Sequence, residues 1–592
     1  MMVPFLDVKQ SVLGKCWKLR SYDDMLGLTL SQSLNIPEIL CRLLAARGFG
    51  VSAAQDYLSP SLKKVLPDPS TFKDMDLATA RLIKAIHNCE KIAVLGDYDV
   101  DGATSSALLA RFFAQLGIKL RIYIPDRIEE GYGPNCGAFE QLKQEGISVV
   151  ITVDCGTTSH EPLQFAADLG LDIIVVDHHA AEPKLPLAVA LINPNRLDET
   201  NSFKSLAAVG LCFLLVVALN RALRLAGYYN SHPEPDLLNL LDLVALGTVC
   251  DVMPLTGLNR AYVAQGLKVL AQRQNRGLKA LYDVSGICEH PSAYHLGFIL
   301  GPRINAGGRV GQADLGARLL CSENSVETQE IAVVLDQLNQ QRKEIEQQVL
   351  EQAMALAEKQ ETPFIMVAGE GWHPGVIGIV ASRLKERFNR PACVIAIDQD
   401  GVGKGSGRSV TGLDLGAMIH AARQTGLLVA GGGHAMAAGF TVKAEMILAL
   451  HQFLIERMKC FELELAPTLH VDALLTIEAA TVEFVKCIEQ MAPFGMGNTL
   501  PRFGFRELQL ARADIVGEAH IRCVFVQRDG KRLQGIAFRA IGTALETVLL
   551  ENKGAFLNVV GSLRLDSWQG QEKIQLTIED VSRAFTNLNA VA

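Results

Sequence analysis

Short apolar runs alternate with segments of helical spacing between residues 91 and 177. Short, continuous apolar runs of this kind are typical of strands that are buried on both faces. Each helical segment ends at a glycine. The expected strands span 92–95, 118–124, 148–154 and 171–177, and the expected helices span 103–116, 135–145 and 159–169. Strands that alternate with helices in this way predict a parallel, doubly wound sheet.

The pattern changes after residue 324. Residues 325–360 form a polar-rich helical segment with one narrow apolar stripe, and at about 1.5 Å per residue it would reach roughly 50 Å. This helix either connects two bodies or packs along one domain. Strands at 364–368 and 392–397, around a helix at 374–388, predict a second, smaller α/β domain. Short alternating strands then predict an antiparallel barrel or sandwich, and an OB-type barrel is one candidate.

We therefore expect an α/β protein built from a parallel-sheet domain, a long connecting helix, a second α/β domain and a C-terminal OB-like β domain. An N-terminal region rich in Leu and Ala is expected to be helical and carries no chemical signature. The expected boundaries are 1–70 for the N-terminal region, 71–324 for the parallel-sheet domain, 325–360 for the helix, 361–458 for the second α/β domain and 459–592 for the β domain.

Composition agrees with a folded protein of several domains, since 49% of the 592 residues are hydrophobic and 20% are charged. The net charge of −8 does not point to nucleic acid, although local basic patches can exist within an acidic total. The 13 cysteines include no CxxC pair, which argues against a zinc framework and favours a reducing cytoplasm. The first ten residues lack signal-peptide features, and the apolar segment 206–219, about 14 residues long, predicts a buried helix rather than a membrane span.

Acidic residues follow every expected strand of the parallel sheet. The first strand runs into Asp97, Asp99 and Asp101, the second into Asp126-Arg127, the third into Asp154, and the fourth into Asp177-His178-His179. Any one of these aspartates could simply cap a helix. Ligands of open parallel sheets bind outside the carboxyl ends of the strands, so we expect the four clusters to converge. Asp251 ends an apolar helical run and is either a helix-end residue or a fifth member of the set.

Carboxylates gathered so closely repel one another and raise each other's pKa unless a cation lies among them. Gly96 and Gly102 permit the turn that would bring the aspartates together. Carboxylate oxygens with some imidazole suit Mn²⁺ or Mg²⁺ better than structural zinc. The set is large enough for two ions about 3.5–4 Å apart, an arrangement that hydrolyses phosphodiesters or phosphoanhydrides. Two adjacent histidines on an extended chain point to opposite sides, so one could bind metal while the other faces the substrate.

Three glycine-rich strings fit a phosphate-rich substrate. One string carries Ser406 and Arg408, one carries His434 on a glycine turn, and one carries Arg303, Asn305 and Arg309. Arginine binds phosphate with two parallel hydrogen bonds, and glycines let backbone N–H groups approach the anion closely. Each string by itself is also typical of an ordinary loop.

These motifs together resemble the DHH phosphoesterase superfamily and, within it, the RecJ single-strand-specific exonucleases. The resemblance rests on "GDYDVDGATS", "PDR", "TVDCGT", "VVDHH", "GTVCDVMPL", "GPRINAGGR", "WHPGVIGIVASRLKERF", "KGSGRS" and "GGHAMAAG", in the family order over residues 90–440. "PFGMGNTLPRF" and the β-rich tail resemble the OB-type domain of bacterial members. In these terms 71–324 would be the DHH catalytic domain and 361–458 the DHH-associated domain.

The resemblance implies a 5′-to-3′ exonuclease that hydrolyses single-stranded DNA to mononucleotides in DNA repair and recombination. A DNA helicase and a single-strand-binding protein are the implied protein partners. The implied ligands of manganese or magnesium are Asp97, Asp99, Asp101, Asp154, His178 and Asp251, and Asp154, His178 and His179 are the implied catalytic residues, with His179 close to the reacting phosphate. The implied substrate-binding residues are Arg127, Arg303, Asn305, Arg309, Ser406, Arg408 and His434.

One departure from the family pattern is Cys155, which stands where many relatives have asparagine and could alter the support of the ligands. Two other functions compete with the nuclease. The first is a DHH phosphodiesterase for short oligonucleotides or cyclic dinucleotides, against which the length and the β-rich tail argue. The second is a catalytically silent scaffold that binds DNA or replication proteins, against which the complete ligand set argues.

Overall fold

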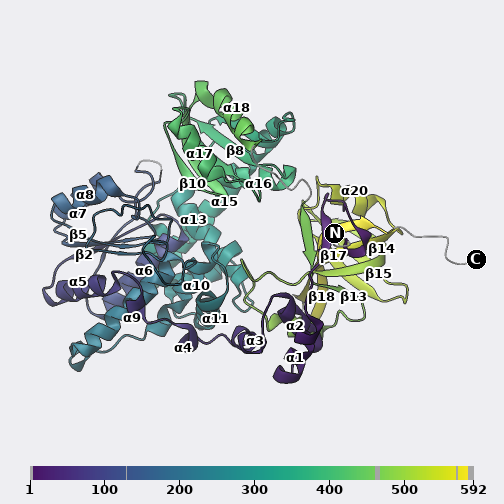
Figure 1. The fold of residues 1–592 in the computed structure, drawn as a ribbon, viewed down its shortest axis with the longest axis horizontal. Helices are drawn as coiled ribbons and strands as arrows, with labels where there is room; N and C mark the ends of the chain where they lie inside the picture. The colour runs from purple at the N-terminus through teal and green to yellow at the C-terminus, as the bar shows by residue number, and fades with distance from the viewer. Residues whose placement is uncertain (1–3, 128–129, 460–466, 569–570, 585–592) are drawn as a thin grey trace, which may run out of the picture. The chain divides into compact units, whose positions relative to one another are not determined.

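The computed structural model describes residues 4–127, 130–459, 467–568 and 571–584. The chain forms two compact units, which Figure 1 draws as ribbons. One unit comprises residues 65–463, and the other combines residues 1–64 with residues 464–592. The N-terminal region, which the sequence presented as a separate part ending near residue 70, is therefore grouped with the C-terminal β domain up to residue 64.

The larger unit contains a five-stranded parallel sheet of order β3-β2-β4-β5-β6. The sequence predicts the first four of these strands but not the fifth, β6. Its strands are β2 Ile92–Gly96, β3 Arg121–Tyr123, β4 Val149–Val153, β5 Asp172–Val176 and β6 Ala190–Ile192. Every residue of β2 and β4 is buried, because helices cover both faces of the sheet. The chain leaves β2 toward β3 on one side and returns to β4 on the other, so the strand order reverses beside β2.

Helices α7 Cys136–Gln144 and α8 His160–Asp168 cover one face of this sheet (Figure 1). The other face is covered by α5 Met75–His87, α6 Val100–Gln115 and α9 Ala208–Leu225. Further helices complete the domain: α10 Leu241–Cys250, α11 Gly257–Ala271, α12 Arg276–Val284, the π-helical turn η5 His295–Leu300, α13 Gly301–Val310 and α14 Leu315–Cys321.

The apolar helix α9 is longer than the sequence predicted. It continues through Asn220 and Arg221, where we expected it to end, because the Asn220 side chain donates to Glu234 and accepts from the Tyr229 hydroxyl. Its 18 residues are long and apolar enough to cross a membrane, but 72% of them are buried inside the protein, as in a core helix. The expectation of a buried helix is confirmed, and the expected length of about 14 residues is wrong.

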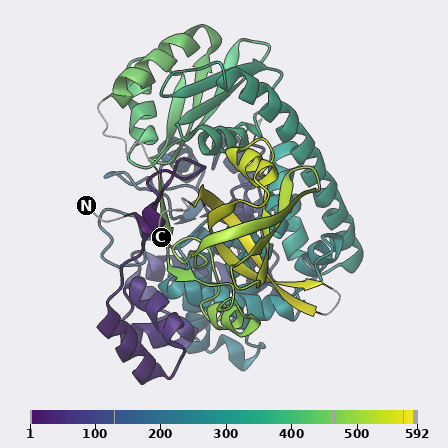
Figure 2. The same ribbon diagram turned by 90° about the vertical axis from the view of Figure 1, so that its right-hand side faces the viewer.

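Helix α15 Ser325–Ala357 runs without interruption into the second α/β domain (Figure 2). That domain has a mixed sheet of order β10-β11-β9-β8-β7 and three helices. Its elements are β7 Ile365–Glu370, α16 Ile377–Phe388, β8 Ala392–Ile397, β9 Val402–Arg408, α17 Leu415–Gln424, β10 Ala430–His434, β11 Ala437–Lys443 and α18 Ile447–Met458.

The glycine-rich strings form regular elements, so the ordinary loop, of which each string by itself is also typical, is not what they are. Residues 301–310 form helix α13, and residues 402–408 form strand β9, which pairs with β8 on one side and β11 on the other. Their glycines serve close packing: a Cβ on Gly405 would overlap the Phe440 ring, and one on Gly308 would lie 2.8 Å from the Tyr98 carbonyl oxygen. Most backbone N–H groups of these strings are therefore engaged within the protein.

The smaller unit contains a closed β-barrel, which agrees with the predicted OB-like domain. Its sheet has the order β13-β14-β15-β16-β18-β17, and β14 also pairs with β17, which closes the barrel. The strands are β13 Ala473–Leu475, β14 Phe503–Val516, β15 His520–Val526, β16 Arg532–Ala537, β17 Phe556–Trp568 and β18 Gln571–Arg583, with α19 Val482–Glu489 and α20 Ala544–Glu551 between them.

The N-terminal segment is joined to this barrel by a strand and by helices. Strand β1 Cys16–Leu19 pairs in parallel with β12 Thr468–Val471. Helices α1 Asp24–Leu34, α2 Glu38–Ala46, α3 Val51–Leu58 and α4 Leu62–Val65 follow, and α1 to α3 share one apolar cluster with the barrel. The fully buried Asp580 of β18 accepts hydrogen bonds from Ser11 Oγ at 2.5 Å and from Trp17 Nε1 at 3.0 Å.

Asp580→Ala should lower the free energy of unfolding of this unit by about 2–4 kcal/mol, because it leaves buried donors without an acceptor. Thermal or denaturant unfolding measures the loss. The exposed Asp566 on β17 is the control, and its change to Ala should alter stability by no more than about 0.5 kcal/mol. Equal stability of the two variants would contradict the role assigned to Asp580.

Candidate metal centre and active site

The carboxyl ends of β2 and β4 lie side by side at the point where the strand order reverses, which is where open α/β sheets bind ligands. Asp97 follows β2 directly, and Asp99 is the N-cap of α6, where its Oδ1 accepts from the backbone N–H groups of Asp101 and Gly102. One carboxylate of this run therefore does cap a helix, and its second oxygen is left for a ligand.

Two glycines bring the loop after β2 close to α6. We expected Gly96 and Gly102 to supply conformational freedom for a turn, yet neither has a positive φ. A Cβ on Gly96 would overlap Ser106 Oγ, and a Cβ on Gly102 would overlap the backbone of Asp97. These positions need glycine because the chain segments nearly touch.

Asp101 and Asp154 reach the same place from other elements. Asp101 is buried in the first turn of α6, and its two oxygens accept from the N–H groups of Ala208 at 2.7 Å and Val209 at 2.9 Å, at the start of α9. Asp154 follows β4 in the left-handed region at φ 61°, which aspartate tolerates better than most residues. Only 3% of Asp154 is exposed.

The Asp-His-His run after β5 is ordered by its own aspartate. Asp177 Oδ1 accepts from His179 Nδ1 at 2.7 Å and from the His178 backbone N–H at 2.7 Å, while Oδ2 accepts from the Thr157 N–H. The side chain of His179 is 49% exposed and that of His178 is 10% exposed. We did not assign Asp177 to the site from sequence, although its position directly before the two histidines was the available signal.

The predicted ligands do converge. Three overlapping groups have ligand atoms within 4.8 Å of one another: Asp97 with Asp99 and Asp154, Asp101 with His178 and Asp251, and Asp154 with His178 and His179. His178 Nε2 lies 3.1 Å from Asp154 Oδ1 and 3.5 Å from Asp251 Oδ2. Asp251, the C-cap of α10, is therefore a member of the site.

Hard divalent cations fit this donor set. Asp97 Oδ1 and Asp251 Oδ2 are buried oxygen atoms that accept no hydrogen bond from the residues that the structure describes, so each has a lone pair to offer a cation. The three groups, found among the described residues, contain carboxylate oxygens and imidazole nitrogens but no cysteine. Two groups share Asp154 and two share His178, as would suit two neighbouring ions.

The buried carboxylates of the site repel one another, and this repulsion raises their pKa values. Burial, with the charges of neighbouring carboxylates, raises the pKa of Asp101 to about 7 and that of Asp251 to about 9. The same causes raise the pKa values of Asp97 and Asp154. Burial and the neighbouring His179 lower the pKa of His178 to about 4, which keeps its imidazole neutral and able to bind metal.

The pair formed by Asp177 and His179 has the opposite behaviour. Burial would raise the pKa of Asp177, but the hydrogen bonds from His179 and Thr157 lower it overall. Burial would likewise lower the pKa of His179, but the hydrogen bond to Asp177 and nearby carboxylates raise it. His179 is therefore the imidazole of the site that holds a proton more readily.

Tyr132 lies beside His179, Tyr98 lies beside Tyr132, and Arg127 lies over Tyr98. Tyr132 donates its hydroxyl to the Asp154 carbonyl at 2.9 Å, and its ring lies edge-on to His179 at 5.9 Å between centroids. Tyr98 lies edge-on to Tyr132, and the Arg127 guanidinium lies over the Tyr98 ring at 5.1 Å. The sequence indicated Arg127, but no pattern singled out the tyrosines.

Ser406 and Arg408 meet on the second α/β domain, and His434 ends β10, two strands away from Arg408 in the same sheet. Arg408 Nη1 lies 3.1 Å from Ser406 Oγ, and a Cβ on Gly378, in the first turn of α16, would lie 3.0 Å from both side chains. Arg408 and Ser406 thus stand at a helix N-terminus beside a position without a side chain, which is a favourable place for an anion. Burial lowers the pKa of His434, and the charges of Arg408 and His179 lower it further.

Two of the predicted phosphate-binding arginines already hold protein oxygens. Arg303 Nε donates to Asp336 on α15 at 2.8 Å, and Arg309 Nη1 donates to the Gly375 carbonyl at 2.8 Å, which joins α13 to the turn before α16. Asn305 lies half-buried on the same helix. Their role in binding substrate stays a prediction. Cys155 packs in the apolar cluster formed by α7, α8 and the sheet, and its thiol donates to the Val153 carbonyl rather than to a candidate metal ligand.

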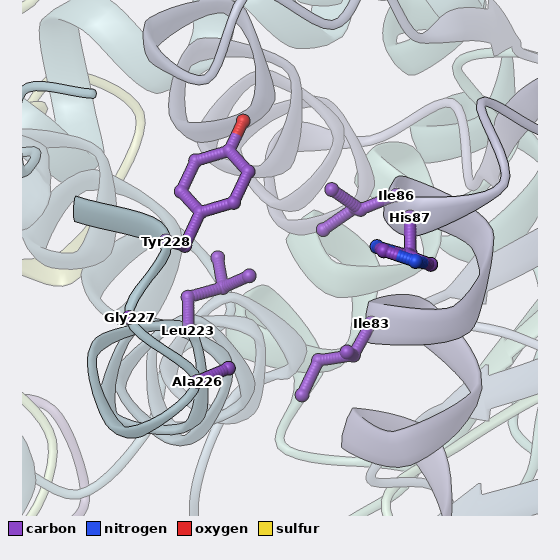
Figure 3. Close-up of a pocket in the computed structure, with 7 residues that line it drawn as sticks. All are labelled: Ile83, Ile86, His87, Leu223, Ala226, Gly227 and Tyr228. Carbon is purple, nitrogen blue, oxygen red and sulfur yellow. The ribbon is translucent and has the colours of Figure 1, made fainter. Parts of the chain in front are cut away.

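A separate pocket of about 240 Å³ lies between the C-terminal ends of α5 and α9 (Figure 3). It is lined by Ile83, Ile86, His87, Leu223, Ala226, Gly227 and Tyr228, of which none belongs to the carboxylate cluster.

Known proteins resemble this chain over nearly its whole length. The single-stranded-DNA-specific exonuclease RecJ of Bacillus subtilis is 36% identical over 574 residues, which are 96% of this chain and 70% of the relative. That of Escherichia coli is 36% identical over 567 residues, 92% of this chain and 96% of the relative. The crystal structure of Thermus thermophilus RecJ with Mn²⁺ matches with a TM-score of 0.80 and 28% identity, and covers 95% of this chain and 79% of that chain. The Mg²⁺ complex of the same protein matches with a TM-score of 0.75 and 27% identity, over 96% and 78%.

Family models match three parts of the chain. Residues 91–248 match the N-terminal domain of the DHH family, 360–459 the DHHA1 domain, and 471–580 the RecJ OB domain. The parallel sheet with its Asp-His-His run and the second α/β domain thus define a DHH protein with a DHHA1 domain. The OB match and the identity to relatives over most of the chain are more specific: the chain belongs to the RecJ family.

Divalent metal should stabilise the protein more at pH 8.5 than at pH 6.5. The pKa values of Asp101 and Asp251 are raised in the folded state, so the metal-free protein loses stability as pH rises from about 4, the usual carboxyl pKa, toward 7 and 9. A cation binds the ionised forms, and its affinity should increase about tenfold per pH unit for each proton it displaces. Thermal unfolding with Mg²⁺ and with EDTA measures the difference; an increment independent of pH would contradict it.

Proposed function

We propose that this protein is a metal-dependent exonuclease specific for single-stranded DNA, with Mn²⁺ or Mg²⁺ as its cofactor. The observation that carries the proposal is the convergence of six carboxylate and imidazole ligands at the switch point of the sheet: Asp97, Asp99, Asp101, Asp154, His178 and Asp251. Membership of the RecJ family supports it, because relatives are named single-stranded-DNA-specific exonucleases and solved RecJ structures contain Mn²⁺ or Mg²⁺.

The ligands divide between two cation positions. Asp97 and Asp99 would serve one, Asp101 and Asp251 the other, and Asp154 and His178 could contribute to both. When bound, two divalent ions supply the charge that activates a water and stabilises the phosphate and its leaving oxygen. The lowered pKa of His178 keeps its imidazole neutral, so that the lone pair of Nε2 would bind a cation.

His179 is suited to act on the phosphate. Asp177 accepts its Nδ1–H, which holds the ring and leaves Nε2 for the substrate. Its raised pKa and partial exposure suit a group that neutralises charge on the phosphate or gives a proton to the leaving oxygen. Tyr132 limits the movement of this ring from one side.

Ser406, Arg408 and the N-terminus of α16 are the proposed site for the terminal 5′ phosphate, with Arg127 and His434 beside it. An anchored 5′ end places the first phosphodiester near the cations, so degradation proceeds from 5′ to 3′ and releases mononucleotides. A helicase and a single-strand-binding protein remain predicted partners that would supply the single strand. The free cysteines of the described residues suit a cytoplasmic location.

An end-labelled single strand tests the function. With Mn²⁺ or Mg²⁺, the purified protein should release a 5′ label first as a mononucleotide, and EDTA should stop the reaction. Asp154→Asn should reduce the rate by at least about 10³-fold, because it removes a charge from two of the ligand groups. Loss of the 3′ label first, equal attack on blunt duplex, or cleavage limited to dinucleotides would overturn the proposal.

Arg408→Ala should remove the preference for a 5′-phosphorylated strand over a 5′-hydroxyl strand. Charge-assisted hydrogen bonds of about 1.5–3 kcal/mol correspond to a loss of roughly 10–100-fold in kcat/KM on the phosphorylated strand. Lys443, exposed at the end of β11, is the control, and its change to Ala should leave the preference intact. A preference that survives in Arg408→Ala would place the phosphate elsewhere.

A further inference from the structure

Two asparagines in the turn after β6 donate hydrogen bonds to the backbone of the Asp-His-His run. This turn, residues 193–196 with the sequence Asn-Pro-Asn-Arg, has no acidic or imidazole side chain. Asn193 is 1% exposed, and Asn195 is half-buried. Asn193 Nδ2 donates to the His179 carbonyl at 2.9 Å, and Asn195 Nδ2 donates to the His178 carbonyl.

These side chains take the place of backbone donors beyond the end of the β5–β6 pairing. The parallel pairing of β5 with β6 ends at Val176 opposite Ile192, and Asp177 N–H still donates to the Ile192 carbonyl. Beyond that point the carbonyls of His178 and His179 accept from asparagine side chains instead of backbone N–H groups. The direction of both imidazoles therefore depends on the two amides.

The orientation of the Asn193 amide is set by its neighbours. Its Oδ1 accepts from the Asn195 N–H at 2.7 Å, so Nδ2 must face the opposite side, where it meets both the His179 carbonyl and Thr157 Oγ1 at 2.8 Å. The Thr157 N–H in turn donates to Asp177 Oδ2 at 3.0 Å. One buried amide thus links the segments that follow β4, β5 and β6.

The turn itself is rigidly held. Arg196 is 8% exposed, and its Nη1 donates to Asp74 Oδ2 at 2.6 Å and to the Leu191 carbonyl at 2.7 Å. Its Nε and Nη2 donate to Asp198, both at 2.9 Å. The Lys204 ammonium donates to the Pro194 carbonyl between the two asparagines. A turn fixed in this way can transmit its position to the carbonyls above it.

We propose that Asn193 and Asn195 are positioning residues for the metal centre. They hold the backbone of His178 and His179 so that one imidazole meets the carboxylates and the other meets the substrate. The inference rests on the proposed metal-dependent nuclease function and adds residues that touch neither cation nor DNA. Outer partners that orient metal ligands typically change metal affinity or activity by about 10–100-fold when they are replaced.

Asn193→Asp is the sharpest variant, because aspartate has nearly the same shape. It keeps an oxygen for the Asn195 N–H but places a carboxylate oxygen against the His179 carbonyl, which removes that hydrogen bond. We expect the Kd for Mn²⁺, measured by electron paramagnetic resonance without DNA, to increase about 10–100-fold. We expect kcat on single-stranded DNA to fall similarly, while KM for the DNA stays within about threefold.

Asn220→Asp is the matched control. Asn220 is 3% exposed in α9 of the same domain, and its Nδ2 donates to Glu234 Oε1 at 2.8 Å. The variant should lower the melting temperature, yet its Kd for Mn²⁺ should stay within about twofold of the unchanged protein.

The outcomes separate this inference from the proposed function. Asn193→Asp with unchanged Mn²⁺ affinity and kcat would overturn the inference, and so would an equal loss of Mn²⁺ affinity in Asn220→Asp. An unaltered protein that neither binds Mn²⁺ nor cleaves DNA would overturn the proposed function instead. If Asn193→Asp does not fold, the half-buried Asn195→Asp, which loses the bond to the His178 carbonyl, decides by the same measurements.

Discussion

Repulsion among buried carboxylates at the switch point between β2 and β4 is the constraint on which the rest of the structure depends. Asp97, Asp101 and Asp154 are each less than 5% exposed, and burial with mutual repulsion raises all three pKa values. Such a cluster opposes folding when it is charged and has no cation. Two backbone N–H groups at the start of α9 donate to Asp101 and offset part of this unfavourable energy. Asp97 Oδ1 and Asp251 Oδ2 accept no hydrogen bond from the described residues, and a cation bound to them would offset the remaining repulsion.

The surrounding fold keeps this cluster in a narrow range of geometries. Glycines at positions 96 and 102 let α6 begin almost against the loop after β2, and the left-handed backbone of Asp154 turns its carboxylate into the same space. Asp177 holds His179, and the turn at 193–196 holds the carbonyls of both histidines. Arg309 joins α13 to the turn before α16, so the second α/β domain is connected to the domain that carries the carboxylates and histidines.

Much of the fold was predictable because burial leaves a periodic trace. Four of the five strands of the parallel sheet, α15 and the β-barrel were expected from periodicity, whereas the short strand β6 was not. The convergence of the strand-end aspartates followed from parallel strand direction alone. Errors arose where a tertiary contact cancels a local signal. Asn220 looked like the end of a helix, but Tyr229 and Glu234 satisfy its amide and α9 continues. The glycine strings looked like loops, but their missing side chains make room for Phe440 and for the Tyr98 backbone.

The sequence by itself determined the kind of site: hard oxygen ligands and histidines after apolar strands, in an order that resembles one nuclease family. The tertiary structure decided which of these groups meet and which are engaged elsewhere. Asp251 joins the cluster from a helix far along the chain, and Asp97 proves to hold an unpartnered buried oxygen, whereas Arg303 and Arg309 bind protein oxygens. Asn193 and Asn195 acquire their role only through contacts with carbonyls after another strand. Residue type and spacing record local chemistry, but a contact between distant segments depends on how the whole chain packs, and no short pattern encodes it.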